Sequence, residues 1–313
     1  MKCTPLLLTA MLLAQAISIA ADDVPAAKTD ARMHASGKSR QLAPASSSDP
    51  HVAHRQETYK QVGNVTLKIE IFEPKQKAAA KKYPAIVFFF GGGWVSGSPQ
   101  QFCPQCEYLA GRGMIAMAAD YRVRTRHHTT PAECVKDGKS AVRWIRAHAE
   151  QLGVDPARIA AGGGSAGGHV AAAVATAPGF EEAGEDTSVS SRPNALVLFN
   201  PVFDNGPAGY GHDRVTEFFP AISPLHNLKP GTPPTLVFLG TTDKLIPVAT
   251  AKDYQAKMQK NGDRCELRLY DGQPHGFFNK TPYSYRTLVE TDKFLASLGW
   301  LEGEPTIAPE LLK

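Results

Sequence analysis

Ser165 is the residue of this sequence best placed to do chemistry. It lies in a G-x-S-x-G spacing between Gly163 and Gly167, after an apolar run and before the alanine-rich stretch 169–177. The pattern predicts a buried strand, a very tight turn and a helix. In such a turn the serine hydroxyl leaves the sheet edge, and the N-terminus of the helix lies behind it. Ser165 could then act as a nucleophile whose developing oxyanion meets the N–H of Ala166.

The same glycine run has other interpretations. Residues 162–168 could form a flexible loop or a turn that cradles a phosphate. No lysine follows the glycines, which disfavours a P-loop, and G-x-G-x-x-G spacing matches only trivially in so glycine-dense a run. The strand–turn–helix context favours the nucleophile.

Asp243 and His275 are the partners that a serine nucleophile needs. Each follows directly after a predicted strand, at 235–239 and 266–270 respectively. Because the carboxyl ends of parallel strands share one edge of a sheet, both residues can meet Ser165 there. His275 would take the serine proton, and Asp243 would orient the imidazole. The order Ser, Asp, His is the one expected for an α/β-hydrolase.

Other acids and histidines compete for these roles. Asp204 follows the preceding predicted strand, but Asp243 directly precedes the strand and loop that carry His275. His169 belongs to the helix behind the serine, where we expect it to pack. His127 and His128 follow another strand and could rim the site. Flanking proline and glycine at a strand end favour His275 as the base.

A second glycine run follows the continuous apolar run 84–90. Gly91, Gly92 and Gly93 could simply end the strand. With a G-x-S-x-G turn downstream, we interpret them as an oxyanion loop, because glycines let free backbone N–H groups approach a substrate oxygen. The N–H groups of Gly92, Gly93 and Ala166 would then hold the oxyanion.

The remaining pattern alternates buried strands with helices. Continuous apolar runs predict strands covered on both faces, and the segments between them have helical spacing. We expect an α/β fold with a mostly parallel central sheet, helices on both faces and no large cap domain. Expected strands are 65–72, 84–90, 114–119, 158–161, 195–199, 235–239 and 266–270, and expected helices are 100–112, 131–152, 169–177, 249–261 and 285–298.

The segment 201–234 contains many glycines and prolines and is expected to be an insertion above the carboxyl edge of the sheet. Its aromatic residues could line an acyl pocket or anchor the loop to the core, and the pattern favours neither role. These residues are Phe203, Tyr210, Phe218 and Phe219.

Composition is that of an ordinary globular protein, with 42% hydrophobic and 20% charged residues in 313. The net charge of +4 is mild, and the basic residues form no stripe with interleaved aromatics. Nucleic acid is therefore not expected as a partner.

The N-terminus has the pattern of a targeting segment. Lys2 precedes a mostly apolar stretch, and residues 18–20 fit a small-x-small cleavage site. We expect a signal peptide at 1–20, although a retained anchor is the alternative. A polar linker at 21–56, a catalytic domain at 57–303 and a C-terminal tail at 304–313 would follow. The mature protein is expected to be exported, periplasmic or extracellular, and not bound to a membrane.

Cysteines other than Cys3 could form disulfides in an exported chain. We expect Cys134 to pair with Cys103 or Cys106, and Cys265 adds a fourth thiol. The single C-x-x-C lacks a second pair or a histidine pair, so no metal site is predicted.

From about residue 84 to 300 the sequence resembles α/β-hydrolase serine esterases of the acetyl esterase and hormone-sensitive-lipase-like group. The resemblance rests on several motifs in order, namely Gly91–Trp94, Asp120–Arg122, Gly153–Pro156, Gly163–Gly168 and Gly240–Asp243. It implies hydrolysis of short acyl esters, of a small molecule or a saccharide, without metal or organic cofactor.

The resemblance has one departure. The family commonly has a histidine before the glycines of the oxyanion loop, where this chain has Phe90. Backbone donors do not depend on that side chain, but the loop must be braced differently. Residues 21–56 are too polar to build a long N-terminal cap, which points to the small carbohydrate-type esterases. A serine peptidase of the same fold and a catalytically silent binding protein are the alternative functions.

Overall fold

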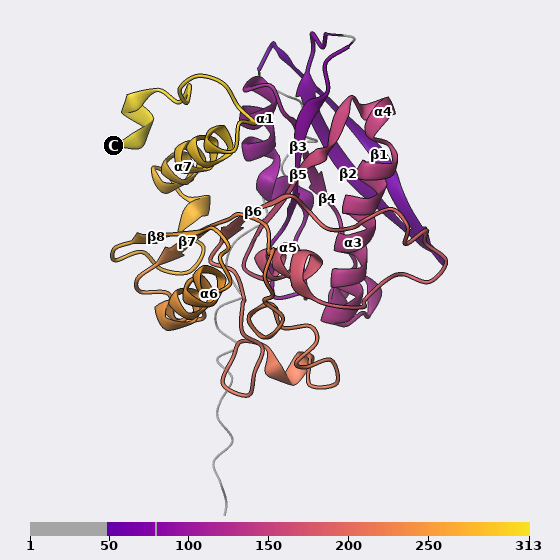
Figure 1. Ribbon diagram of the computed structural model, residues 1–313, viewed down its shortest axis with the longest axis vertical. Coiled ribbons are helices and arrows are strands. Elements are labelled where there is room, and N and C mark those ends of the chain that lie inside the picture. Colours follow the sequence, from indigo (N-terminus) through magenta and orange to yellow (C-terminus); the bar gives the residue numbers. More distant parts are fainter. Residues whose placement is uncertain (1–48, 79) are drawn as a thin grey trace, which may run out of the picture. The chain divides into compact units, whose positions relative to one another are not determined.

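The computed structural model describes residues 49–78 and 80–313. The expected signal peptide at 1–20 and most of the expected linker lie outside these residues. The described chain folds around an eight-stranded sheet with the order β1-β2-β4-β3-β5-β6-β7-β8 (Figure 1).

The sheet is mostly parallel. β1 and β2 form an antiparallel hairpin and β2 pairs antiparallel with β4, whereas every further pair is parallel. The α/β fold expected from the sequence is therefore confirmed. The strands are β1 (Val52–Val62), β2 (Val65–Pro74), β3 (Tyr83–Phe89), β4 (Ile115–Ala119), β5 (Val154–Gly164), β6 (Ala195–Phe199), β7 (Thr235–Gly240) and β8 (Cys265–Tyr270).

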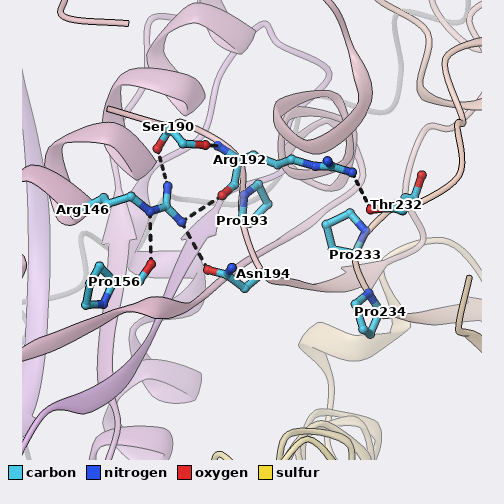
Figure 2. A pocket seen from close by; sticks show the side chains of 10 residues that line it. Arg146, Pro156, Ser190, Arg192, Pro193, Asn194, Thr232, Pro233 and Pro234 are labelled. Carbon is cyan, nitrogen blue, oxygen red and sulfur yellow. Dashed lines mark hydrogen bonds between the residues drawn. The ribbon is translucent and has the colours of Figure 1, made fainter. Parts of the chain in front are cut away.

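The two edges of the parallel strands differ. At the amino edge, a pocket of about 550 Å³ lies among the segments that lead into β6 and β7 (Figure 2). There the Arg146 guanidinium donates to the carbonyl oxygens of Pro156, Ser190 and Arg192. These bonds tie the segment before β6 to helix α3 (Pro131–Ala147), which carries Arg146. Ser165, Asp243 and His275 follow strands and so lie at the opposite, carboxyl edge.

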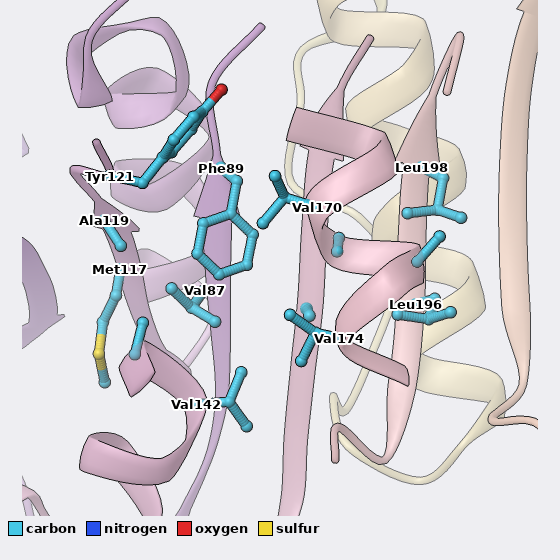
Figure 3. Close-up of a cluster of buried hydrophobic side chains, with 14 of the residues drawn as sticks. Val87, Phe89, Met117, Ala119, Tyr121, Val142, Val170, Val174, Leu196 and Leu198 are labelled. Atoms are coloured by element: carbon cyan, nitrogen blue, oxygen red, sulfur yellow. The ribbon is translucent and has the colours of Figure 1, made fainter. Parts of the chain in front are cut away.

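Helices cover both faces of the sheet, as expected. Alternate side chains of β3 show the division, since Ile86 and Phe88 belong to a buried cluster that includes residues of α1 and α7, and Val87 and Phe89 belong to one that includes residues of α3, α5 and α6. Figure 3 shows part of the second cluster, with Val142 of α3 and Val170 and Val174 of α5. The α-helices are α1 (Cys103–Gly111), α2 (Arg124–His127), α3 (Pro131–Ala147), α4 (Ala149–Leu152), α5 (Ala166–Thr176), α6 (Val248–Lys260) and α7 (Tyr283–Ser297).

Short 3-10 helices lie between these elements. The segment 201–234 contains two of them and no α-helix, so no large cap domain stands between β6 and β7. The 3-10 helices are η2 (Pro99–Phe102), η3 (His212–Arg214), η4 (Pro224–His226), η5 (Phe277–Asn279) and η6 (Pro309–Leu312).

Two boundaries expected from the sequence were wrong. Residues 52–56 belong to β1 rather than to a linker. β1 is an edge strand rich in charged and polar residues, so it has no apolar alternation to reveal it. The helix expected over 131–152 is divided at His148 into α3 and α4.

The last ten residues are attached to the helices beside them. The Thr306 N–H donates to the Tyr108 hydroxyl at 3.1 Å, and Arg286 Nε donates to the Leu312 carbonyl at 2.7 Å. The expected tail therefore runs along α1 and α7.

The expected disulfide is wrong. Cys103, Cys106, Cys134 and Cys265 are all buried free thiols in the described chain. Cys134 packs in the cluster on the α3 face of the sheet, whereas Cys103 and Cys106 pack in the cluster on the α1 face. The sheet thus separates the expected partners. Burial raises the pKa of the Cys103 and Cys265 thiols to about 12, which leaves them unreactive.

A buried ion network holds β1 against α3. The fully buried Asp137 carboxylate accepts from Lys60 Nζ at 2.7 Å and from Arg122 Nη2 at 2.8 Å. Glu182 accepts from the same two cations. The segment between α5 and β6 is thereby tied to helix α3.

None of the helices described at 49–78 and 80–313 has both the length and the apolarity to cross a bilayer.

We expect Asp137→Asn to lower the free energy of unfolding by about 3 kcal/mol, because two buried cations lose a shared anion. Glu57→Gln is the control, since Glu57 pairs with Arg55 at the surface and its loss should cost at most about 1 kcal/mol. Urea denaturation of both variants measures the difference. Equal losses would contradict the role assigned to Asp137.

Candidate active site

Ser165 lies in a strained backbone conformation at the carboxyl end of β5. Its φ and ψ are 53° and −117°, and α5 begins at the next residue. Glycines permit the turn, because a Cβ on Gly167 would lie 2.0 Å from the Phe89 carbonyl oxygen, and one on Gly163 would lie 2.5 Å from that of Gly167. The strand, the turn and the helix pack together only with these residues.

The structure brings Ser165, His275 and Asp243 together in one chain of hydrogen bonds. His275 Nε2 lies 2.9 Å from Ser165 Oγ, and His275 Nδ1 lies 2.7 Å from Asp243 Oδ2. The Asp243 carboxylate is fully buried, whereas the imidazole is 22% exposed. A neutral imidazole with its proton on Nδ1 would donate to Asp243 and accept from the serine hydroxyl.

The loops that carry the acid and the histidine are joined to each other. The other oxygen of Asp243, Oδ1, accepts from the N–H groups of Leu245 and Ile246 at 2.8 and 2.9 Å. Just before it, the Thr241 N–H donates to the carbonyl of Tyr270, the last residue of β8, and the Thr242 N–H donates to the carbonyl of Gln273 in the loop after β8. The distance between Asp243 and His275 is therefore set by backbone bonds.

Asn200 also holds the histidine loop, and sequence reasoning missed it. This fully buried residue follows β6, accepts from the Gly276 N–H at 3.0 Å through Oδ1, and lies 3.4 Å from His275 Nε2 through Nδ2. Its position at the end of a buried strand, next to the predicted site edge, is the signal that could have indicated it.

The second glycine run forms a tight turn beside Ser165. Gly92 and Gly93 have φ of 128° and 63°, and the Gly92 carbonyl accepts from the Val95 and Ser96 N–H groups. In the part of the chain that the structure describes, the N–H groups of Gly92, Gly93 and Ala166 have no protein acceptor. They are free to bind an oxygen.

Gln101 fixes the start of this turn and was likewise missed. Its Oε1 accepts from the Gly91 N–H at 2.6 Å, and its Nε2 donates to Asn279 Oδ1 at 3.1 Å. Asn279 donates in turn to the Gly276 carbonyl. One side chain thus connects the glycine turn to the loop of His275, and nothing in the local sequence around Gln101 signals it.

Phe90 supports the turn at the residue that precedes its glycines. Its ring stacks on Tyr121 with centroids 4.1 Å apart, and the Tyr121 hydroxyl donates to the Phe90 carbonyl at 2.7 Å. Gly97 fits against the same ring, where a Cβ would lie 2.4 Å from a ring carbon. An aromatic stack therefore fills the position where the resembling family has a histidine.

His169 supports the turn through a hydrogen bond with Trp94. It is fully buried, its Nδ1 accepts from the Trp94 indole N–H at 3.3 Å, and its Nε2 lies 3.0 Å from the Ile222 carbonyl. Burial lowers the pKa of His169 to about 4. The neutral ring can therefore accept at one nitrogen and donate at the other.

The aromatic residues of 201–234 divide between the two roles left open by the sequence. Phe203 stacks on Tyr254 and Phe218 packs on Phe180, so both anchor the segment. Phe219 contacts two histidines of its own segment. Tyr210 alone approaches the site, because a Cβ on Gly93 would lie 3.2 Å from its hydroxyl.

The rival residues make other contacts. Asp204 accepts from the Gly206 N–H at 2.7 Å and lies 3.9 Å from His226. His127 accepts from the Val123 N–H, and burial lowers its pKa. His128 ends α2 in a left-handed conformation. Across the described residues, His, Cys, Asp and Glu form no group of three or more that could hold a metal.

Comparison with known proteins shows to which family the chain belongs. The BD-FAE family model matches residues 69–205, and the Dienelactone hydrolase family model matches residues 205–304. Thermogutta terrifontis esterase 2, in a structure phosphoramylated by tabun, is 47% identical, with a TM-score of 0.77 over 82% of this chain and 97% of that chain. The chain belongs to the α/β-hydrolase serine esterase family.

This α/β-hydrolase also matches curated esterases over part of their length. Esterase LipC of Mycobacterium tuberculosis is 32% identical over 63% of this chain and 54% of the relative. The acetylxylan esterase of Xylanibacter ruminicola is 26% identical over 71% of this chain and 46% of the relative. The chain spans about half the length of these relatives.

The low pKa of His169 predicts a pH-dependent stability of this α/β-hydrolase. Unfolded histidine titrates near 6.5, so between pH 6.5 and 4 the unfolded chain binds more protons than the folded one. The contribution of neutral His169 to the free energy of unfolding is complete above pH 6.5 and is lost as the pH falls from 6.5 toward 4. Between pH 7 and 4.5 we expect wild type to lose about 2 kcal/mol more unfolding free energy than His169→Gln.

Denaturant unfolding at the two pH values measures this difference. His127, whose pKa is also lowered, is present in both proteins and cancels in the comparison. Equal losses in wild type and variant would show that His169 does not titrate in this way.

Proposed function

We propose that this protein hydrolyses carboxylic esters with short acyl groups through an acyl-enzyme on Ser165. The observation that carries the proposal is the hydrogen-bonded chain from Ser165 Oγ through His275 to Asp243. The family supports the reaction class, because the similar proteins are named esterases.

In the first half-reaction, Ser165 Oγ attacks the ester carbonyl carbon while His275 Nε2 takes the serine proton. The carbonyl π electrons move to oxygen and form a tetrahedral oxyanion. When this collapses, the bond to the alcohol oxygen breaks, and His275 gives its proton to that oxygen. The buried Asp243 carboxylate stabilises the imidazolium between the two proton transfers.

In the second half-reaction, water attacks the acyl-enzyme. His275 takes a proton from the water, the acid leaves, and the proton returns to Ser165 Oγ. The same groups act in reverse order, so no further residue is needed for deacylation.

The oxyanion is assigned to the N–H groups of Gly92, Gly93 and Ala166. These donors come from two turns that are fixed before substrate binds, so little reorganisation is needed during the reaction. Losing one such donor typically costs about 3 kcal/mol of transition-state stabilisation.

A short acyl group and a saccharide alcohol are the substrate that we propose. Supporting this choice, solved structures of Thermogutta terrifontis esterase 2, 46% and 45% identical to this chain, are described as propionate bound and butyrate bound. A relative named acetylxylan esterase supports the saccharide. The signal-like sequence at 1–20 supports export of the protein, and an exported enzyme would encounter saccharide esters outside the cell membrane.

We expect wild type to hydrolyse 4-nitrophenyl acetate and butyrate with a kcat/KM that falls toward the decanoate. Ser165→Ala should lower kcat by 10⁴-fold or more, on the order found for other serine hydrolases, while the fold is kept. Release of nitrophenolate measures the rate. Turnover of these esters by Ser165→Ala at the wild-type rate would contradict the nucleophile assignment.

Organophosphates give an independent test of the nucleophile. A relative of known structure is described as phosphorylated by paraoxon. We expect paraoxon to inactivate this protein and to add one diethylphosphoryl group to the peptide that contains Ser165, as seen by mass spectrometry. Inactivation with the label on another residue would move the nucleophile.

Substitution of two aspartates tests which carboxylate orients His275. Asp243→Asn should lower kcat about 10³–10⁴-fold, because the wrong imidazole tautomer is then favoured. Asp204→Asn changes a carboxylate that caps its own loop and should lower kcat less than threefold. A severe loss in Asp204→Asn with a mild loss in Asp243→Asn would reverse the assignment.

A further inference from the structure

Arg214 lies beside the turn that we assign to the oxyanion. Its Nη1 donates to the Gly93 carbonyl at 3.0 Å, and its guanidinium carbon lies 5.6 Å from the centroid of the Tyr210 ring. A Cβ on Gly93 would lie 3.1 Å from Arg214 Nη1 and 3.2 Å from the Tyr210 hydroxyl. Glycine thus lets a half-buried cation and a phenol approach the site.

Arg214 differs from other arginines of this protein, because it has no ion-pair partner among the described residues. Most arginines that contact the core pair with carboxylates, as Arg122 does with Asp137 and Arg143 with Glu181. Within residues 49–78 and 80–313, no carboxylate oxygen lies within 4.0 Å of a guanidinium nitrogen of Arg214. Its one bond to a carbonyl leaves most of its five donors available.

A second arginine, Arg124 at the start of α2, is joined to the same turn through its backbone. The Arg124 N–H donates to the Trp94 carbonyl at 3.1 Å, and the side chain is exposed. In the described chain it too has no carboxylate within 4.0 Å. Its neighbour Arg126 is neutralised by Asp120. Arg124 and Arg214 therefore bring positive charge near the turn at 93–94, and neither has a carboxylate within 4.0 Å among the described residues.

This arrangement favours a particular kind of substrate. A guanidinium held against an aromatic ring presents a planar fork of donors, which matches a carboxylate. An anion bound there would lie beside the turn that carries the proposed oxyanion donors without occupying them, because Arg214 contacts the Gly93 carbonyl and not its N–H.

We propose that Arg214 forms a carboxylate-binding subsite, and that the preferred substrates are esters that carry a carboxylate outside the scissile bond. This proposal rests on the ester hydrolysis proposed above. The carboxylate can belong to the alcohol, as in an acetylated uronic acid, or to the acyl group, as in the half-ester of a dicarboxylic acid.

Two matched substrate pairs distinguish these sources. The acetylated methyl glycosides of glucuronic acid and glucose differ by a carboxylate in the alcohol. Monoethyl succinate and ethyl butyrate differ by a carboxylate in the acyl group. For each pair the measured quantity is the ratio of kcat/KM for the charged member to kcat/KM for the neutral member.

We expect Arg214→Gln to lower this ratio about tenfold in the pair whose carboxylate reaches the subsite. Glutamine can still donate to the Gly93 carbonyl, so a role limited to bracing the turn would affect both members of a pair alike. Arg214→Lys keeps the charge and should retain part of the ratio. In wild type, added salt should raise KM for the charged member more than for the neutral one.

Arg192→Gln is the matched control. Arg192 also donates to a glycine carbonyl, that of Gly231, and it lies at the opposite edge of the sheet (Figure 2). The Arg192→Gln variant removes the same charge from the protein as Arg214→Gln, and it should leave the kcat/KM ratios of both pairs unchanged.

The proposed subsite would be overturned if, in both substrate pairs, the ratio for Arg214→Gln stayed within twofold of the wild-type ratio. It would also be overturned if the ratio fell equally in Arg192→Gln. Hydrolysis of the neutral esters that depends on Ser165 would then still support the proposed function. No hydrolysis of any of the four esters by folded wild type would instead overturn the proposed function itself.

Discussion

The backbone of Ser165 is the constraint on which the rest of the structure depends. A residue with φ of 53° is unfavourable unless its surroundings hold it there. Its N–H donates to the Phe199 carbonyl at 2.9 Å, and its carbonyl accepts from the His169 N–H at 2.9 Å. The turn also needs Gly167, whose Cα faces the Phe89 carbonyl. β3, β6 and α5 must therefore be packed in register before the hydroxyl can stand at the sheet edge.

The glycine turn beside Ser165 is held by side chains from separate parts of the chain. Gln101 fixes its first N–H, and the stack of Phe90 on Tyr121 supports it from below. Arg214 and His169 hold the Gly93 carbonyl and the Trp94 indole. Backbone donors act on a developing oxyanion only when they are fixed in advance. Through Arg214 the segment 201–234 braces the turn, and Phe203 and Phe218 anchor that segment to the rest of the fold.

Charge is distributed unevenly around this edge. Buried cations away from it, such as Lys60 and Arg122, are neutralised by Asp137 and Glu182. Beside the turn, Arg214 has no carboxylate within 4.0 Å among the described residues. His169, the buried titratable ring there, stays neutral because burial lowers its pKa to about 4. The buried cations away from the edge are therefore paired, His169 is neutral, and the cation at the Gly93 carbonyl is Arg214.

The sequence by itself determined the order of the buried strands, the tight turn at Ser165 and the placement of Asp243 and His275 after strands, because these signals are local. It ranked Asp243 above Asp204, but only the tertiary structure places one of them 2.7 Å from the imidazole. Polar side chains such as Gln101, Asn200 and Arg214 act through contacts with segments far away in sequence, and no periodicity encodes such contacts. The expected cysteine pairing failed for the same reason, since spacing along the chain does not reveal on which face of the sheet a helix packs.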